Sequence, residues 1–202
     1  MLSHAVEIAS VDGLGGLTIG RLADVTGHSK SGVATLFGSK EQLQLAAVAA
    51  ASEIFVESVI APARADTGRG LDRVCALIGQ WLSYSERRVF AGGCFFSAVG
   101  AEFDAKPGAV RDAIVSAYAR WEDYLTASIE HARVAGELPG LDDARQLAFE
   151  IDAYLEAANS RSLMYETAEP YERAVTAVRS RLLALGADPA IVELLARPVG
   201  NG

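Results

Sequence analysis

Hydrophobic residues recur at helical spacing in two short runs between Thr18 and Leu43, and a glycine-containing turn separates the two runs. The side-chain oxygen of Thr18 can cap the first run, whose apolar positions share one helical face. Gly27 ends this run, because glycine tolerates the left-handed conformation found at helix C-termini. The predicted apolar faces consist of Ile19, Leu22, Ala23 and Val25 in the first helix and of Val33, Leu36 and Phe37 in the second.

A much longer helix follows the second run. Gly38 interrupts the pattern, and Ser39 with Gln42 three residues later forms a capping box. The next residues are rich in alanine and contain no glycine or proline before Pro62. We expect this helix to reach about residue 60 and to bridge two regions of the chain, with the polar segment from Pro62 to Gly70 as a connector.

The rest of the chain also shows helical periodicity and no alternating strand pattern of useful length. A first helix is predicted before the glycines at 13–16, and later helices over about 71–88, 107–135, 141–165 and 170–185, with a short one to about 196. The strongest periodicity is formed by Val110, Ile114, Tyr118, Trp121, Leu125, Ile129 and Ala132. The prediction is an all-α chain of nine or ten helices.

Composition restricts the class of protein. The chain has 202 residues, half of them hydrophobic, so it can bury a sizeable core. No stretch of 18 apolar residues lacks charges, and the N-terminus lacks the pattern of a secretion signal, so we expect a cytoplasmic protein with no membrane partner. Two cysteines, Cys75 and Cys94, are too few and too far apart for a disulfide scaffold or a structural zinc site.

Two short helices joined by a tight turn are typical of a helix-turn-helix, which places its second helix in the DNA major groove. The segment GHSKSGVATLFGSKEQL, residues 27–43, also resembles the DNA-binding signature of tetracycline-repressor (TetR) family regulators. Ala34 and Leu36 depart from that signature, since family members usually carry an aromatic residue at the first position and a polar ring at the second. The matching positions are Gly27, Ser29, Phe37, Ser39, Lys40, Glu41 and Leu43.

The resemblance implies a homodimeric transcriptional regulator that binds double-stranded operator DNA as a repressor and is released by a small, mostly apolar effector. Residues 1–44 would form the DNA-binding domain, and residues 45–202 the ligand-binding and dimerisation domain. Thr18 and Lys40 are expected to contact phosphates, and the turn and second helix to form the recognition surface. The DNA-binding candidates are Thr18, His28, Ser29, Lys30, Ser31, Gly32, Thr35 and Lys40.

Effector and dimer sites rest on the same resemblance. Aromatic residues of the middle helices suit an apolar ligand, although core packing is the more common role of such residues. The effector candidates are Trp81, Tyr84, Cys94, Phe95, Phe96, Phe103, Tyr118 and Trp121. The last two long helices have wide apolar faces that either pack against a second subunit or are buried within one chain. The dimer candidates are Ile151, Tyr154, Leu155, Ala158, Ser162, Val175, Val178 and Leu182.

The charge balance opposes simple nonspecific DNA binding. The net charge is −8, and acidic residues slightly outnumber basic ones in the first 45 residues. The alternatives are a helical adaptor or a degenerate regulator that does not bind DNA, and a helical-bundle enzyme. The sequence contains no catalytic motif, paired-cysteine spacing or phosphate-binding loop, so we expect no catalytic residues, no metal site and no cofactor. Cys94 would be a redox-sensing thiol if exposed, and an inert one if buried.

Overall fold

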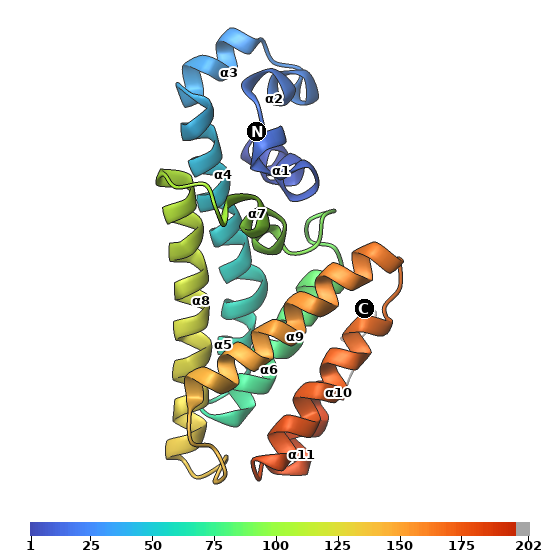
Figure 1. The fold of residues 1–202 in the computed structure, drawn as a ribbon. Coiled ribbons are helices and arrows are strands. Elements are labelled where there is room, and N and C mark those ends of the chain that lie inside the picture. Colours follow the sequence, from blue (N-terminus) through green and yellow to red (C-terminus); the bar gives the residue numbers. More distant parts are fainter. Residues whose placement is uncertain (197–202) are drawn as a thin grey trace. The chain divides into compact units, whose positions relative to one another are not determined.

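The computed structural model describes residues 1–196, and these residues form helices connected by turns (Figure 1). Ten helical runs result when contiguous segments are counted together, so the prediction of an all-α chain with nine or ten helices is confirmed. The α-helices are α1 (Leu2–Gly16), α2 (Ile19–Thr26), α3 (Lys30–Phe37), α4 (Lys40–Phe55), α5 (Ala61–Asp66), α6 (Leu71–Glu86), α7 (Phe95–Phe103), α8 (Ala109–Val134), α9 (Ala144–Tyr165), α10 (Glu169–Ala184) and α11 (Pro189–Val192). A π-helical turn, η1 (Val56–Ile60), joins α4 to α5, and a 3-10 turn, η2 (Glu193–Ala196), follows α11.

The chain divides into two compact units. The first consists of Met1–Phe55 and Arg88–Tyr118, and the second of Val56–Arg87 with the described part of the chain from Ala119 onward. The first unit therefore contains α1–α4, α7 and the beginning of α8. The division at residues 44 and 45, made from the sequence, remains a prediction.

The first unit has its core where α1 packs against α4 and α7. Ala5, Val6 and Ala9 of α1 are fully buried, as are Leu43 and Ala47 of α4. The two short helices α2 and α3 pack against each other and against α1 and α4 respectively.

The bridging helix differs from its prediction after residue 55. The π-helical turn η1 leads directly into α5, so the chain remains helical to Asp66 and the predicted connector from Pro62 is wrong in its first part. Pro62 lies at the beginning of α5, where its missing N–H and its ring cause least disturbance. A π turn widens the helix locally, and the wider turn precedes this proline directly.

The continuous helix Lys40–Asp66 is long and apolar enough to cross a membrane, judged by length and composition alone. A core helix of a soluble protein passes the same test. Leu43, Ala47 and Ala51 are fully buried in the chain, and 39% of the most apolar window of this segment is buried.

The second unit is built around α6, which contacts α5, α9, α11 and η2. Val74, Leu77, Ile78, Trp81 and Leu82 form its buried face, as the periodicity predicts. Helices α9 and α10 lie side by side along their length (Figure 1).

A buried hydrogen-bond network connects α6 to the α9–α10 pair. The hydroxyl oxygens of Ser85 and Tyr171 lie 2.8 Å apart, and Ser85 also donates to Asn159 Oδ1 over 2.8 Å. Ser162 donates to the Tyr171 hydroxyl over 2.8 Å. Because removing one partner leaves buried polar atoms unsatisfied, this network fixes how the three helices pack.

Candidate functional site

The helix-turn-helix is held in place by local hydrogen bonds. Thr18 Oγ1 accepts from the Arg21 amide at 3.1 Å, and Ser29 Oγ accepts from the Gly32 amide at 3.1 Å, so each residue caps the helix that follows it. Gly27 has a φ of 68°, the left-handed conformation that the sequence predicts for the turn. Ser39 caps α4 in the same way, through the Gln42 amide at 3.1 Å.

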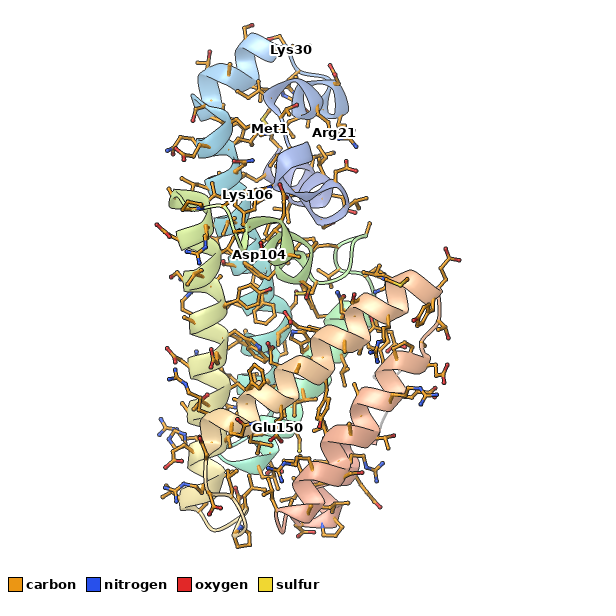
Figure 2. The ribbon with its side chains drawn as sticks, in the orientation of Figure 1. Met1, Arg21, Lys30, Asp104, Lys106 and Glu150 are labelled. Atoms are coloured by element: carbon orange, nitrogen blue, oxygen red, sulfur yellow. The ribbon has the colours of Figure 1, made fainter. Side chains whose placement is uncertain are left out.

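Helix α3 exposes almost all of its surface. Val33 is fully buried and anchors the helix, whereas Lys30, Ser31, Gly32 and Thr35 are exposed. Figure 2 shows Lys30 at the beginning of this helix. Exposed small polar and basic residues on a short, anchored helix are the properties that a recognition helix needs.

Two residues predicted on apolar faces are exposed instead. Val25 is 52 % exposed, and Leu36 is 63 % exposed. In α3 only Val33 is buried, because the helix is short and packs along a single narrow edge. Leu36 consequently belongs to the exposed surface of α3, where an aliphatic side chain can contact a thymine methyl group.

Seven of the eight DNA-binding candidates, all but Lys30, also make hydrogen bonds within the part of the chain that the structure describes; they include the bond from Thr35 Oγ1 to the carbonyl oxygen of Ser31. Thr18 is half-buried and caps α2, and His28 Nδ1 lies 2.8 Å from the carbonyl oxygen of Thr26. Lys40 Nζ donates to the carbonyl oxygen of Gly15 over 2.7 Å. Lys40 therefore stabilises the turn between α1 and α2 in addition to any contact with DNA.

The structure adds two residues to this region that the sequence analysis missed. Gln44, on α4, is buried and donates to the carbonyl oxygen of Leu14 over 2.7 Å. Glu102, on α7, accepts from the amide of Gly15 over 2.9 Å. Both contacts join residues distant in sequence, so no local pattern indicates them.

The eight effector candidates fall into both units. Cys94, Phe95, Phe96, Phe103 and Tyr118 belong to the first unit, and Trp81, Tyr84 and Trp121 to the second. Cys94 is 4 % exposed, so burial favours the inert thiol. Phe95 and Phe96 pack edge to face, as do Phe96 and Tyr118. Most of these side chains therefore have a core-packing role.

Phe103 and Tyr118 also line a groove of about 370 Å³ between α7 and α8 in the first unit. Ile114 and Val115 supply further apolar surface, and Arg111 supplies a positive charge. The Tyr118 hydroxyl donates to the carbonyl oxygen of Phe96 over 3.0 Å, which fixes the orientation of its ring. The groove offers largely apolar walls with one basic residue, Arg111, and one acidic residue, Asp104.

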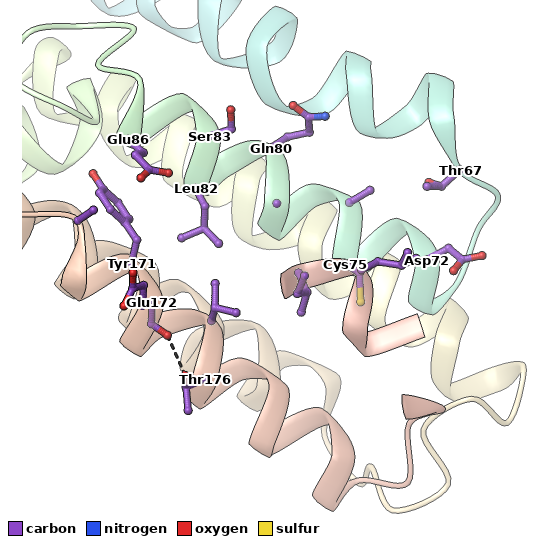
Figure 3. Close-up of a pocket in the computed structure, with 16 residues that line it drawn as sticks. Thr67, Asp72, Cys75, Gln80, Leu82, Ser83, Glu86, Tyr171, Glu172 and Thr176 are labelled. Atoms are coloured by element: carbon purple, nitrogen blue, oxygen red, sulfur yellow. Dashed lines mark hydrogen bonds between the residues drawn. The ribbon is translucent and has the colours of Figure 1, made fainter. Parts of the chain in front are cut away.

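A larger cavity of about 600 Å³ lies in the second unit among α6, α10 and η2 (Figure 3). None of the eight effector candidates is among its lining residues in the described part of the chain. Its lining combines Leu82 with the carboxylates of Glu86 and Glu172. Cys75 also lines it, and burial raises the pKa of its thiol to about 12, so the thiol is neutral and unreactive near pH 7.

One carboxyl group in the second unit has a strongly shifted pKa. The indole N–H of Trp121 donates to Asp152 Oδ1 over 2.7 Å. Burial raises the pKa of Asp152 to about 6; the Trp121 hydrogen bond opposes the rise, and the charges of Glu156 and Glu122 add to it. Asp152 is therefore a half-buried carboxyl group whose ionised form is less favourable in the folded chain than in water.

The dimer candidates differ in exposure within the single chain, and their place in an interface remains a prediction. Ile151, Leu155, Ala158, Ser162, Val178 and Leu182 are each at most 2 % exposed, and only Tyr154 and Val175 are half-buried. The six buried residues are covered within the chain itself, where α9 packs against α6 and α10. Helical periodicity identified the apolar faces correctly but could not tell which partner covers them.

The exposed side of α9 is also apolar. Phe149 is 64 % exposed and Met164 is 72 % exposed, and the exposed residues Ala153 and Ser160 lie between them at helical spacing. Phe149 and Met164 lie about 22 Å apart along the helix, with the half-buried Glu156 on the same face between them. Exposed large apolar side chains of this kind are candidates for an interaction surface. We name Phe149, Ala153, Ser160 and Met164 the outer face of α9.

A helix-turn-helix with an exposed recognition helix, followed in the chain by a larger set of helices, defines the class of helix-turn-helix DNA-binding regulators. The family model described as "Tetracyclin repressor-like, C-terminal domain" matches residues 70–178. The chain belongs to the TetR family of transcriptional regulators.

Solved structures agree with this assignment. A TetR transcriptional regulator from Chloroflexus aurantiacus J-10-FL is 30% identical, with 88% of this chain and 89% of that one covered and a TM-score of 0.80. A TetR-family regulator from Agrobacterium tumefaciens is 20% identical over 91% of this chain and 94% of that one, with a TM-score of 0.78. AibR, solved in complex with isovaleryl coenzyme A and operator DNA, is 19% identical over 79% and 86% of the two chains, with a TM-score of 0.65. Among curated proteins, none matches this chain.

Proposed function

We propose that the protein is a dimeric repressor that binds double-stranded operator DNA through α3 and is released by a small-molecule effector. The observation that carries the proposal is the exposed polar surface of α3, anchored by Val33 and capped by Ser29. Family membership supports DNA binding, and AibR shows that a protein of this fold can bind both a small molecule and operator DNA.

Contacts with DNA divide into two kinds in this proposal. Lys30 and the free amides at the beginning of α3 bind phosphate, because a helix N-terminus favours an anion. Ser31, Thr35 and the exposed Leu36 face base edges in the major groove. His28 and Gly32 flank this surface and allow the backbone to approach DNA closely.

The proposed dimer forms through α9 and α10, with the outer face of α9 at its centre. Small residues on the exposed side of both helices, including Ala153 and Ala184, allow a second pair of helices to approach closely. A twofold dimer presents two recognition helices to two half-sites of the operator. The operator is then expected to be an inverted repeat, because its symmetry matches that of the dimer.

The effector is proposed to be small and mostly apolar, as the aromatic residues of the middle helices suggest. The groove at Phe103 and Tyr118 supports this proposal, since both are effector candidates and its walls are largely apolar. An effector can release DNA only if it binds the released arrangement more tightly than the DNA-bound one. The helix Lys40–Asp66 and helix α8 run through both units and are the covalent connections along which such a change can pass.

The test is binding of the full chain to a labelled duplex from the region upstream of its own gene, over a series of salt concentrations. A regulator that neutralises phosphates will lose affinity linearly with the logarithm of salt concentration. No binding even at low salt would contradict DNA binding and favour the helical adaptor.

Lys30→Ala is expected to weaken binding to all DNA sequences by about five- to tenfold at low salt and to reduce the salt slope by about 1, because one phosphate contact is lost. Lys30 tests this better than Lys40, whose ammonium group also binds the carbonyl oxygen of Gly15. Fluorescence anisotropy measures both quantities.

Arg69→Ala serves as the matched control for Lys30→Ala. Arg69 is exposed in the turn before α6 and its removal deletes the same charge. An equal loss of affinity in both variants would show that net charge, not a contact of α3, determines binding.

A further inference from the structure

The glycine-rich turn Gly13–Gly16 ends α1, and backbone conformation explains only part of its composition. Gly13 has a φ of 71°, which breaks the helix and favours glycine. Gly15 has no positive φ, so its backbone conformation is open to any residue. A Cβ atom at Gly15 would nevertheless lie 2.6 Å from Glu102 Oε1. A side chain at position 15 would therefore displace the carboxylate of Glu102 from its contact with the turn.

Glu102 comes from α7 and fills the space that two missing side chains leave. Its Oε1 atom accepts from the Gly15 amide over 2.9 Å, and Lys106 Nζ lies 3.4 Å from the same oxygen. Its Oε2 atom lies where a Cβ atom of Gly13 would approach to 2.5 Å. Among the described residues, Oε2 is buried without a hydrogen-bond partner. Burial of a charged oxygen is unfavourable, so the contact with the turn must compensate for it.

The same turn is held from α4. Lys40 Nζ donates to the carbonyl oxygen of Gly15 over 2.7 Å, and Gln44 donates to the carbonyl oxygen of Leu14 over 2.7 Å. Gly15 thus has its amide bound by α7 and its carbonyl bound by α4. Two residues further on, Leu17 is fully buried and Thr18 caps α2. The position of this turn sets where the helix-turn-helix begins.

Helix α1 is attached to the chain segment before α7 at a second place. The Ala91 amide donates to Glu7 Oε1 over 3.1 Å, and the Gly92 amide donates to Ser10 Oγ over 3.3 Å. A Cβ atom at Gly92 would lie 1.8 Å from the carbonyl oxygen of Ser10, so the two segments are in direct backbone contact. These contacts link the segment before α7 to α1 and to the turn that follows it.

We infer that Glu102 is a positioning residue that holds the α1–α2 turn in the arrangement competent for DNA binding, and that the Gly13–Gly16 turn is shaped to receive its carboxylate. This inference rests on the proposed function as a DNA-binding regulator. In this inference, the hydrogen bond from the Gly15 amide to Glu102 Oε1 couples α7 to the helix-turn-helix.

The direction in which DNA affinity changes distinguishes a positioning role of Glu102 from a purely electrostatic one. Removing a negative charge from a DNA-binding protein should raise its affinity for DNA. Glu102→Ala is expected to lower affinity instead, on the order of tenfold, because a charge-assisted hydrogen bond that positions the turn is lost. Glu102→Gln keeps the accepting oxygen and is expected to bind DNA at least as tightly as the unaltered chain.

The experiment measures binding of the upstream duplex by the unaltered chain, Glu102→Ala, Glu102→Gln and the control Asp104→Ala. Asp104 follows α7 directly and is exposed, so Asp104→Ala removes a charge from the same place without touching the turn. Thermal unfolding of each variant by circular dichroism shows whether it is folded. Gly15→Ala should reproduce the loss, since its Cβ displaces the carboxylate, and combining it with Glu102→Ala should cause little further loss.

Hydrogen exchange at the Gly15 amide supplies a readout that needs no DNA. Exchange should be faster in Glu102→Ala and remain slow in Glu102→Gln. A Glu102→Ala variant with undiminished DNA affinity, or an equal loss in Asp104→Ala, would overturn the inference. Failure of the unaltered chain to bind DNA would instead contradict the proposed function, and unchanged exchange at Gly15 in Glu102→Ala would still refute the holding contact.

Discussion

Asp152→Asn is expected to stabilise the protein at pH 7 by up to about 3 kcal/mol, because it removes a half-buried charge whose pKa is raised from 3.8 to about 6. The amide oxygen of asparagine can still accept the indole hydrogen bond of Trp121. In the unaltered chain the folded state binds more protons than the unfolded state between these two pKa values. Its free energy of unfolding therefore falls as pH rises through that range and stays reduced above it.

Chemical denaturation at several pH values measures this effect. The advantage of Asp152→Asn should be full at pH 7 and should vanish below about pH 4, where the carboxyl group is protonated in both states. Asp142→Asn, at an exposed carboxylate before α9, is the control and should change stability by less than about 0.5 kcal/mol. A constant difference between Asp152→Asn and the unaltered chain at every pH would show that packing, not ionisation, causes it.

Phe149→Glu is expected to convert the proposed dimer to a monomer and to weaken operator binding by about a hundredfold or more, because two linked half-site contacts become one. Phe149 is 64 % exposed in the single chain, so the substitution leaves the fold of one subunit intact. In the proposed dimer it would place an unpaired carboxylate in an apolar interface. Analytical ultracentrifugation gives the mass, and anisotropy gives the affinity.

Val134→Glu is the control for this substitution, since Val134 is a 74 % exposed apolar residue at the end of α8. It should leave both mass and affinity unchanged. A Phe149→Glu protein that remains dimeric would place the interface elsewhere than the outer face of α9.

Local patterns predicted the features that local chemistry determines. Thr18, Ser29 and Ser39 cap helices as expected, and Gly27 adopts the left-handed conformation of the turn. The apolar face of α6 is buried as its periodicity predicts. These features depend on residues within one or two helical turns of each other, so the sequence contains all that is needed.

Features that depend on distant partners could not be predicted in the same way. The sequence shows that Leu155 and Val178 lie on apolar faces, but packing within one chain and packing between two chains produce the same periodicity. The bond from Gly15 to Glu102 joins residues 87 positions apart, and no spacing rule indicates it. The exposure of Leu36 depends on how narrowly α3 contacts α2 and α4.

The individual DNA contacts of the candidate residues remain predictions. Selection of binding sites from random DNA tests most directly whether these residues together recognise an operator. Random-sequence duplexes are mixed with the full chain, and bound duplexes are recovered, amplified and sequenced over several rounds. A dimeric reader of the major groove should enrich an inverted repeat whose half-sites lie about one helical turn, or a multiple of it, apart. Enrichment of no sequence, or of a single half-site without its inverted copy, would contradict a dimeric operator-binding regulator.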